Sequence, residues 1–455
     1  DDFNKNPINN IARNAITCLG SQLSTINHDR IKDIDHAYTF SVKKKGLKAT
    51  NQGRSGRCWM FAGLNMFRHF IVNSLKLDQF EFSETYLFFY DKLERCNGYL
   101  QWFIDNPDVK CDSRYFEFMT LGHMSDGGWW NTFANLIKKY GIVPKSVMGE
   151  TYQSEDSEDM NTIIREQLNN CVVKLKSRHK KYHESLKYDT MKQIHSTLVK
   201  FLGQPPRSFD WYFTIDDDDN NNTTTSVQKL TPFTFKQMVL PSINLDDFIM
   251  LCNIPTKKYG QVYEIDYTKN VLEGDNCSML NAPMYELTKY CIKSIENSMP
   301  VWIAADVRNK CNWYYSALDD ELDSGTAIFG EHKKLTKGNQ LVFGNTQANH
   351  AMCITGVKLS KDGKPLAWQV ENSWSYVDNT VPGLDGWIWM SHSWFQKYVI
   401  EVVVHRQFLS RTMNGHLDRP STVVSPFDVV SRITKVTGLN AGSQYLNKMK
   451  FRRRL

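Results

Sequence analysis

The sequence predicts an α+β fold with segregated parts: a helical N-terminal half, an inserted helical segment and a β-rich C-terminal half. Residues 58–77 repeat apolar side chains every three to four positions, as a buried helix does. Residues 155–200 are rich in charge but keep aliphatic residues at helical spacing. From about residue 300, short β-rich runs alternate with Gly, Pro and Asp turns.

The composition is that of a folded protein. Apolar residues make up 41% and charged residues 23% of the 455-residue chain, and 12 Trp, 20 Tyr and 25 Phe exclude general disorder. This length allows about two to four domains or one elaborated domain. Because no run of about 18 apolar residues occurs, we expect no membrane-spanning segment.

The positive charge is concentrated at the C-terminus. The formal net charge is +6, and the last eight residues, 448–455, carry five positive charges. The remainder is near neutral, which argues against a broadly basic nucleic-acid-binding protein. The tail itself leaves three interpretations open: a solvated end, a weak and salt-sensitive site for nucleic acid or acidic partners, or an extension that is removed.

The ten cysteines are scattered and form no Cys-x-x-Cys pair. Neither a disulfide framework nor a zinc ribbon fits, so we expect mostly buried thiols and a cytoplasmic location. His179 and His183 share a predicted helix face, but a solvated face explains them better than a metal site. The sequence predicts no metal and no cofactor.

The N-terminal half is predicted to be mainly helical. Residues 1–40 have a weakly amphipathic middle and are expected to pack on the surface as an arm. A polar, Gly-containing turn over 51–57 precedes the helix of residues 58–77. Ser83 is a plausible start for a second helix that runs to Glu94.

The middle of the chain contains a helical insertion and a low-complexity run. Gly and Pro are absent from residues 155–202, which supports helices there. Residues 216–225 consist of Asp, Asn and Thr and are expected to form a solvated loop. The strands predicted beyond this segment are 301–305, 351–357, 367–371, 386–390 and 399–404.

Four separated residues supply the groups of a thiol-dependent hydrolase. Cys58 starts a predicted helix, whose dipole favours the nucleophilic thiolate. His350 can accept the thiol proton, and Asn372 can orient the imidazole through its amide oxygen. Gln52 can donate its side-chain N–H to a developing oxyanion. Alone, each residue has a structural explanation, and only their combination favours catalysis.

An amide is sufficient beside His350 because we expect the working state to be a thiolate–imidazolium pair, which needs no further buried anion.

The order Gln-x5-Cys-Trp, His-Ala and Asn-Ser-Trp resembles the papain-like cysteine peptidases, and in particular the bleomycin hydrolase and aminopeptidase C branch. The resemblance runs from about residue 40 to about 410, including the 292-residue gap between Cys58 and His350. Further matching motifs are Phe82-Ser83-x-x-Tyr86-Leu87-Phe88-Phe89, Asp126-Gly127-Gly128, Tyr140-Gly141-x-Val143-Pro144-Lys145 and Val370-Glu371-Asn372-Ser373-Trp374.

The resemblance implies a papain-like fold, a helical half plus a β-barrel-like half, with an inserted helical domain. It also implies the following division of the chain: an N-terminal arm (1–40), a helical half with the nucleophile (41–154), an inserted hook-like helical domain (155–255), a β-rich half with the base (256–412), and a C-terminal arm with a basic tail (413–455).

The resemblance also implies substrate contacts. Gly127 and Gly128, with Asp126 nearby, would form the strand edge that hydrogen-bonds a peptide backbone, although a tight turn would explain the two glycines as well. Trp374 would cover the Asn372–His350 bond and border the substrate, or simply pack in the core. The implied enzyme is a cytosolic homohexamer that removes N-terminal residues from peptides. Bleomycin-like amides and homocysteine thiolactone are further implied substrates.

Three departures qualify the resemblance. Ser55 stands where secreted papain-like enzymes have a disulfide cysteine, and Ser375 replaces the usual Gly after Asn-Ser-Trp. The branch's chains stop soon after the position of Asp428, with their terminal carboxylate anchoring the substrate's amine, but 27 residues follow Asp428 here. An endopeptidase, or a peptidase activated by tail trimming, is therefore an alternative. A nucleic-acid-binding hexameric assembly with residual hydrolase activity is another.

Overall fold

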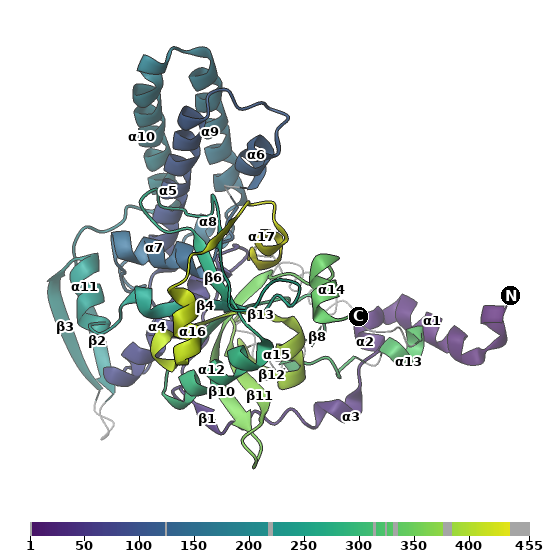
Figure 1. The fold of residues 1–455 in the computed structure, drawn as a ribbon. Coiled ribbons are helices and arrows are strands. Elements are labelled where there is room, and N and C mark those ends of the chain that lie inside the picture. Colours follow the sequence, from purple (N-terminus) through teal and green to yellow (C-terminus); the bar gives the residue numbers. More distant parts are fainter. Residues whose placement is uncertain are drawn as a thin grey trace.

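The computed structural model describes residues 2–122, 125–216, 222–312, 315–323, 325–330, 335–375 and 385–436. It confirms the α+β class: helices cover a large mixed sheet, and a helical hairpin rises from one end of the molecule (Figure 1). The domain limits expected from the sequence stay predictions. The C-terminal tail, including the basic residues 448–455, lies outside the described residues.

Only the first helix of the N-terminal arm departs from the expected surface packing, because from about residue 25 onwards the arm contacts the body, through Asn27 with Leu322 and Arg30 with Asp319. The arm forms a 3-10 turn (Asp2–Lys5) and helices α1 (Pro7–Leu19), α2 (Ser21–Ser24) and α3 (His28–Ile31). Helix α1 buries no residue and projects away from the body (Figure 1). Its Ile8 and Ile11 are 70% and 69% exposed.

The predicted helix of residues 58–77 is confirmed as α4 (Cys58–Ser74), and its first ten residues are all buried. The second predicted helix is α5 (Glu84–Asp105), which is longer than expected. Ser83 caps it by accepting a hydrogen bond from the Tyr86 N–H at 3.0 Å. Shorter elements follow: α6 (Arg114–Glu117), a π-helical turn (Phe118–Gly122) and α7 (Trp130–Tyr140).

The helices expected over 155–200 are present as an antiparallel hairpin of α9 (Glu158–Ser177) and α10 (His183–Leu202), which packs on α5 (Figure 1). Helix α8 (Tyr152–Glu155) precedes the hairpin, and a 3-10 turn (Lys180–Tyr182) connects its two helices. His179 caps that turn, and the Nε2 of His183 bonds the Arg178 carbonyl at 3.1 Å.

The expected loop over 216–225 is wrong for its described residues. Strand β2 (Phe209–Asp216) pairs with β3 (Asn222–Leu230), and Thr223, Thr224 and Thr225 lie opposite Ile215, Thr214 and Phe213. Threonine is β-branched and favours strands, so the polar run extends a hairpin. Residues 217–221 lie outside the described part. Helix α11 (Pro232–Val239) and a 3-10 turn (Leu245–Asp247) follow.

The five strands predicted beyond residue 300 are confirmed and form the centre of one sheet. Three strands between residues 248 and 281 were not predicted, although they extend this sheet. In sheet order the strands are β14 (Thr422–Val424), β5 (Val262–Ile265), β6 (Cys277–Asn281), β4 (Phe248–Cys252), β13 (Val399–His405), β7 (Val301–Ala305), β10 (His350–Leu359), β11 (Pro365–Glu371), β12 (Trp387–Ser391), β9 (Ala317–Leu318) and β8 (Cys311–Asn312), with β1 (Phe40–Ser41) on β10.

The two faces of the sheet have separate cores. Helix α4 packs on one face against β10 and β7, and α12 (Met284–Glu296) packs on the other.

No helix among the described residues is long and apolar enough to span a membrane. The remaining helices are α13 (Gly325–Phe329), α14 (Lys337–Val342), α15 (His392–Tyr398), a 3-10 turn (Arg406–Phe408), α16 (Arg411–Leu417) and α17 (Val429–Thr434).

A buried charge cluster joins α4 to the end of β11. Glu371 lies 2.7 Å from an Arg68 guanidinium nitrogen and 2.9 Å from the His69 Nε2, and all three side chains are at most 1% exposed. Because Glu371 immediately precedes Asn372, this cluster also fixes the position of Asn372 relative to α4.

We predict that Glu371→Ala lowers the free energy of unfolding by about 3–5 kcal/mol, since it leaves Arg68 as an uncompensated buried cation. Urea denaturation of the two proteins measures the difference. Glu184→Ala, which removes an exposed carboxylate from α10, is the control and should change stability by less than about 0.5 kcal/mol. Equal effects of the two substitutions would contradict the role of the cluster.

Candidate active site

Cys58 is the first residue of α4 and is completely buried. Its sulfur accepts a hydrogen bond from the backbone N–H of Ala351, the second residue of β10. The thiol therefore lies between the N-terminus of the central helix and the start of a central strand. Cys58 and His350 are far apart in the sequence, but this hydrogen bond brings Cys58 next to the residue that follows His350.

His350 begins β10, where it pairs with Ala305 of β7. Its Nε2 lies 2.7 Å from the Oδ1 of Asn372, so the ring donates its Nε2 proton to the amide. Nδ1 has no hydrogen-bond partner among the described residues and is left to accept a proton. The Trp374 ring stacks on the imidazole, with 4.2 Å between centroids and 25° between planes, and so covers this bond as expected.

Gln52 lies in the turn before α4, and its side-chain amide is held at both ends. Its Nε2 donates to the Ser55 carbonyl at 2.7 Å, and its Oε1 accepts from the Ser373 hydroxyl at 2.5 Å. These two bonds fix which end of the amide carries the nitrogen. The second N–H of the amide is not used in either bond, so it can serve an oxyanion.

A short backbone seam joins the nucleophile loop to the segment that carries Asn372. Asn51 and Trp374 form an isolated antiparallel bridge. The Gln52 N–H donates to the Ser373 carbonyl at 2.9 Å, and the Ser375 N–H donates to the Thr50 carbonyl at 3.2 Å. The seam thus brings together all four residues that the sequence singled out for catalysis. Ser373 belongs to the Asn-Ser-Trp motif, but the sequence does not predict its hydrogen bond to Gln52.

Asp126 lies beside this loop in a crowded polar cluster. Its carboxylate accepts from Lys92 at 2.6 Å, Asn161 at 2.8 Å, the Gly56 N–H at 3.3 Å and the Ser157 hydroxyl. Burial opposes ionisation, but the Lys92 charge and these hydrogen bonds hold the pKa of Asp126 well below its usual range. The carboxylate therefore ties α5 and α9 to the nucleophile loop.

The Gly127–Gly128 edge is occupied by the chain itself. The Gly127 carbonyl accepts from Arg95 at 2.8 Å, and Gly128 forms an antiparallel bridge with Val436. The Ala348 N–H, two residues before His350, donates to the Ile433 carbonyl at 2.7 Å. From here on, the C-terminal arm means residues 429–436 alone, a shorter segment than the 413–455 range expected from the sequence. It lies between Gly128 and the strand that carries His350, and the Val436 side chain is fully buried.

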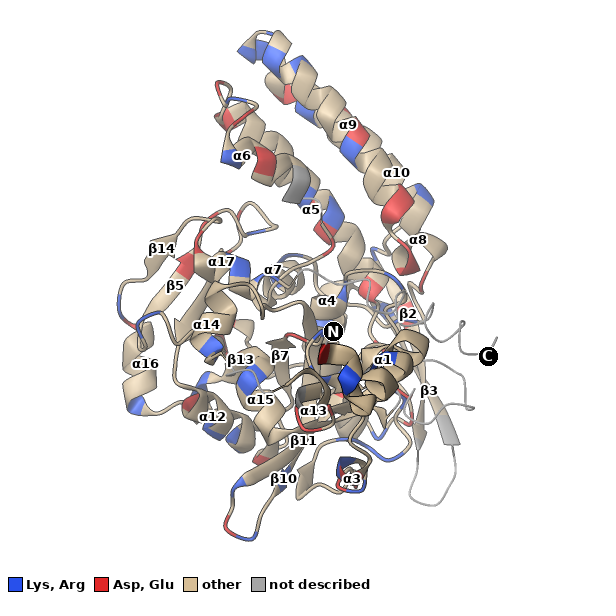
Figure 2. Cartoon of the chain, turned by 90° about the vertical axis from the view of Figure 1, so that its right-hand side faces the viewer, with Lys and Arg blue, Asp and Glu red and all other residues tan. Residues whose placement is uncertain are grey.

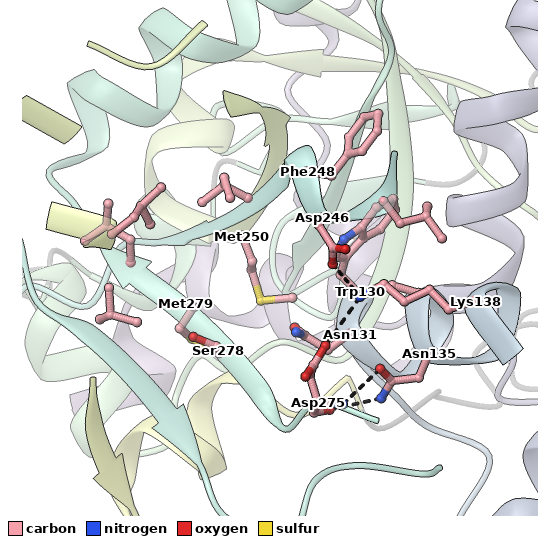
Figure 3. Close-up of a pocket in the computed structure, with 16 residues that line it drawn as sticks. Trp130, Asn131, Asn135, Lys138, Asp246, Phe248, Met250, Asp275, Ser278 and Met279 are labelled. Carbon is pink, nitrogen blue, oxygen red and sulfur yellow. Dashed lines mark hydrogen bonds and ion pairs between the residues drawn. The ribbon is translucent and has the colours of Figure 1, made fainter. Parts of the chain in front are cut away.

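A cavity of about 170 Å³, separate from these residues and lined in part by Trp130, lies between α7 and strands β4 and β6 (Figure 3). Lys138 bridges Asp246 and Asp275 at one side, and Met250 is part of the apolar wall. None of the four catalytic candidates lines this cavity.

The family model described as the Peptidase C1-like family matches residues 1–431. The chain belongs to the Peptidase C1-like family. Its relatives include bleomycin hydrolase of Homo sapiens, 31% identical over 421 residues, which are 89% of this chain and 90% of that protein. Aminopeptidase C of Listeria monocytogenes is 31% identical over 430 residues, covering 94% of this chain and 95% of its own.

The crystal structure of PepW from Lactobacillus rhamnosis is 32% identical and covers 94% of this chain and 95% of that chain, with a TM-score of 0.87. This likeness confirms the papain-like α+β fold. The resemblance to the bleomycin hydrolase and aminopeptidase C branch is confirmed as well.

The electrostatic state of this Peptidase C1-like site differs from the expected ion pair. Burial raises the pKa of Cys58 to about 12, although hydrogen bonds from backbone N–H groups oppose the shift. Burial also lowers the pKa of His350 to about 4, with the Asn372 bond opposing it. At neutral pH the resting pair is therefore thiol and neutral imidazole. The helix dipole is outweighed because both side chains are completely buried.

We predict that removing the arm with a chain ending at Asp428 makes Cys58 alkylate at least about tenfold faster at pH 7. Water then reaches the thiol, its pKa falls from about 12 towards the range of reactive cysteines, and the thiolate fraction rises. Iodoacetamide labelling with peptide mapping separates Cys58 from the exposed Cys18 and Cys111.

A chain ending at Val436 keeps residues 429–436 and loses only those after them, so Cys58 should label faster than in the full chain and more slowly than in the chain ending at Asp428. The full-length chain is the control. The full-length Val436→Asp variant tests the same point without truncation, since an Asp cannot stay unpaired in a fully buried position. Identical labelling rates in all four proteins would show that the arm does not protect the thiol.

Proposed function

We propose that this chain, a cysteine-type aminopeptidase by its family, releases N-terminal residues from peptides through Cys58, His350, Asn372 and Gln52. Cys58 gives its proton to the Nδ1 of His350 and its sulfur bonds to the substrate carbonyl carbon. The amide of Gln52 and the Cys58 N–H stabilise the resulting oxyanion. His350 then protonates the leaving amine, and the C–N bond breaks to leave a thioester.

In the second half of the reaction, His350 takes a proton from water, and the hydroxide oxygen bonds to the thioester carbonyl. The C–S bond breaks, the released amino acid carries the new oxygen, and the proton returns to Cys58. Asn372 keeps the imidazole in the required tautomer throughout. The observation that carries the proposal is the 2.7 Å bond from His350 Nε2 to Asn372 Oδ1, which leaves Nδ1 as the acceptor.

The same chemistry extends to the other substrates of the proposal. Bleomycin-like amides and homocysteine thiolactone each contain a carbonyl group. Attack of the Cys58 sulfur on that carbonyl would form the same kind of thioester. The Gly127–Gly128 edge is the proposed backbone contact for a peptide, and Trp374 borders the reacting carbonyl. Asp126 acts as a positioning residue, because its carboxylate is occupied by Lys92 and its neighbours.

The bridge between Gly128 and Val436 favours a second candidate, an enzyme activated by tail trimming. The arm fills the proposed substrate edge, and 19 residues of the chain follow Val436. No terminal carboxylate can stand at this edge while those residues are attached. Their removal would leave a carboxylate next to Gly128, where it can pair with the free amine of a substrate. An endopeptidase would instead require the arm to leave the edge.

The proposed assembly is a homohexamer, and the free face of α1 supports an assembly of copies. The helix presents Ile8, Ile11 and Leu19, each at least 57% exposed, away from its own chain. A second copy is the partner that could cover this face in every subunit alike.

Two finer proposals concern environment and partners. A cytoplasmic location is supported by ten free cysteines, of which seven are buried. Weak, salt-sensitive nucleic-acid binding would depend on residues 448–455, outside the described part. On that part, basic and acidic residues are interspersed along most helices, which favours the peptidase over a nucleic-acid-binding assembly (Figure 2).

The central prediction uses an N-terminally free peptide and its N-acetylated twin in a mass-spectrometric time course. A chain ending at Val436 should shorten only the free peptide, one residue at a time, because its carboxylate lies at the Gly128 edge. The full-length chain should be at least about tenfold slower until it is trimmed.

Cys58→Ala is the control in both chain lengths and should abolish cleavage. Internal cleavage of both peptides by the full-length chain would support the endopeptidase instead. Absence of Cys58-dependent cleavage in every form would refute the proposed activity.

The assembly proposal predicts that Ile8→Asp with Ile11→Asp lowers the oligomeric state in light scattering, since two charges would then lie on the apolar face of α1. Asn4→Asp with Asn14→Asp puts the same charge on exposed polar positions and should leave the assembly intact. A hexamer that survives the first pair of substitutions would exclude this face as the contact.

A further inference from the structure

We propose that Arg57 and Glu150 are positioning residues for Gln52, so that a buried ion pair behind the nucleophile loop holds the oxyanion donor in place. The inference rests on the proposed function of Gln52. It concerns a chain of hydrogen bonds and charges that runs from the Gln52 amide into the protein, away from the substrate side.

The first step links Gln52 and Ser55 in both directions. The Gln52 Nε2 donates to the Ser55 carbonyl at 2.7 Å, and the Ser55 hydroxyl donates to the Gln52 carbonyl at 2.7 Å. Both residues are completely buried. The side chain and the backbone of Gln52 are therefore held by one neighbour, and any rotation of Ser55 would move the amide.

The second step fixes the Ser55 hydroxyl. The Arg57 Nε donates to the Ser55 Oγ at 2.7 Å while that oxygen donates its own proton to Gln52. A hydroxyl whose donor and acceptor roles are both assigned has one orientation. The position of the Arg57 guanidinium thus determines the position of Ser55.

The third step fixes Arg57. Its Nη2 and Nη1 donate to the two carboxylate oxygens of Glu150 at 2.8 and 3.4 Å, a two-pronged contact. The guanidinium also lies 5.1 and 5.2 Å from the ring centroids of Phe61 and Phe88. Arg57 is completely buried, so Glu150 is the group that compensates its charge.

Glu150 is itself held in place. The Ser154 hydroxyl donates to its Oε2 at 2.5 Å, and the Lys145 Nζ lies 3.9 Å from its Oε1. Lys145 has closer partners, namely Glu81 at 2.6 Å and Glu84 at 3.4 Å. Glu81 therefore belongs to the same charge cluster but pairs with Lys145 and not with Arg57 among the described residues, which makes it a matched control.

The arrangement predicts a specific kinetic defect. The Gln52 N–H acts on the oxyanion, which exists only after attack, so a displaced amide lowers kcat and leaves KM nearly unchanged. Deleting one oxyanion donor costs about 10²–10³ in kcat, and misplacing it should cost about 10–100-fold. Alkylation of Cys58 by iodoacetamide forms no oxyanion and should not change.

The test is a double-mutant cycle on the active form of the enzyme with the free peptide. Glu150→Gln should lower kcat about 10–100-fold with KM within about twofold, whereas Glu81→Gln should leave both unchanged. In a Gln52→Ala background, Glu150→Gln should cause no further loss, because its effect acts through Gln52.

Ser55→Ala removes the middle of the chain without touching a charge, and it should reproduce the kcat loss if Glu150→Gln proves too unstable to assay. Equal losses from Glu150→Gln with and without Gln52 would overturn the inference, as would a parallel loss of Cys58 alkylation. A wild-type enzyme without Cys58-dependent cleavage would instead refute the proposed function, so the two failures are distinguishable.

Discussion

The active site depends on the backbone seam between the nucleophile loop and the segment after β11. Three hydrogen bonds within residues 50–52 and 373–375 join parts of the chain more than 300 residues apart. The seam places the start of α4 against the start of β10, and Glu371 holds the same segment from beneath through Arg68. Gln52, Cys58 and Asn372 lie within six positions of these contacts, and the 2.7 Å hydrogen bond from His350 to Asn372 brings in the fourth residue.

The C-terminal arm is the segment that we expect to control the electrostatic state of that site. It lies along the Gly128 edge and next to the strand that carries His350, and both catalytic groups are without exposed surface. Burial then favours an uncharged thiol and an uncharged imidazole. We therefore expect access to the active site and the reactivity of the Cys58 thiol to change together, because opening the site restores the water that stabilises a thiolate.

The sequence predicts the local elements of the fold better than its long-range contacts, and its assignment of the catalytic residues stays a prediction. The order of Gln52, Cys58, His350 and Asn372 predicted the catalytic group, and periodicity predicted α4, α9, α10 and the five central strands. The strands between residues 248 and 281 were missed because each is short and their pairing depends on β13. The pairing of Arg57 with Glu150, 93 positions apart, and the pairing of Gly128 with Val436 leave no local signal in the sequence. The polarity of residues 223–225 predicts a loop, but these threonines are β-branched and pair within β3 instead.

The most direct test of the account is to map the cysteines modified by a leucine chloromethyl ketone with a free amine, using the chain that ends at Val436. The account predicts modification of Cys58 among the ten cysteines, and loss of that modification in His350→Ala, because Cys58 is the thiol to which we assign a base, His350, and an amine anchor, the Val436 carboxylate. Modification of the exposed Cys18 and Cys111 at the same rate as Cys58, or an unchanged rate in His350→Ala, would contradict it.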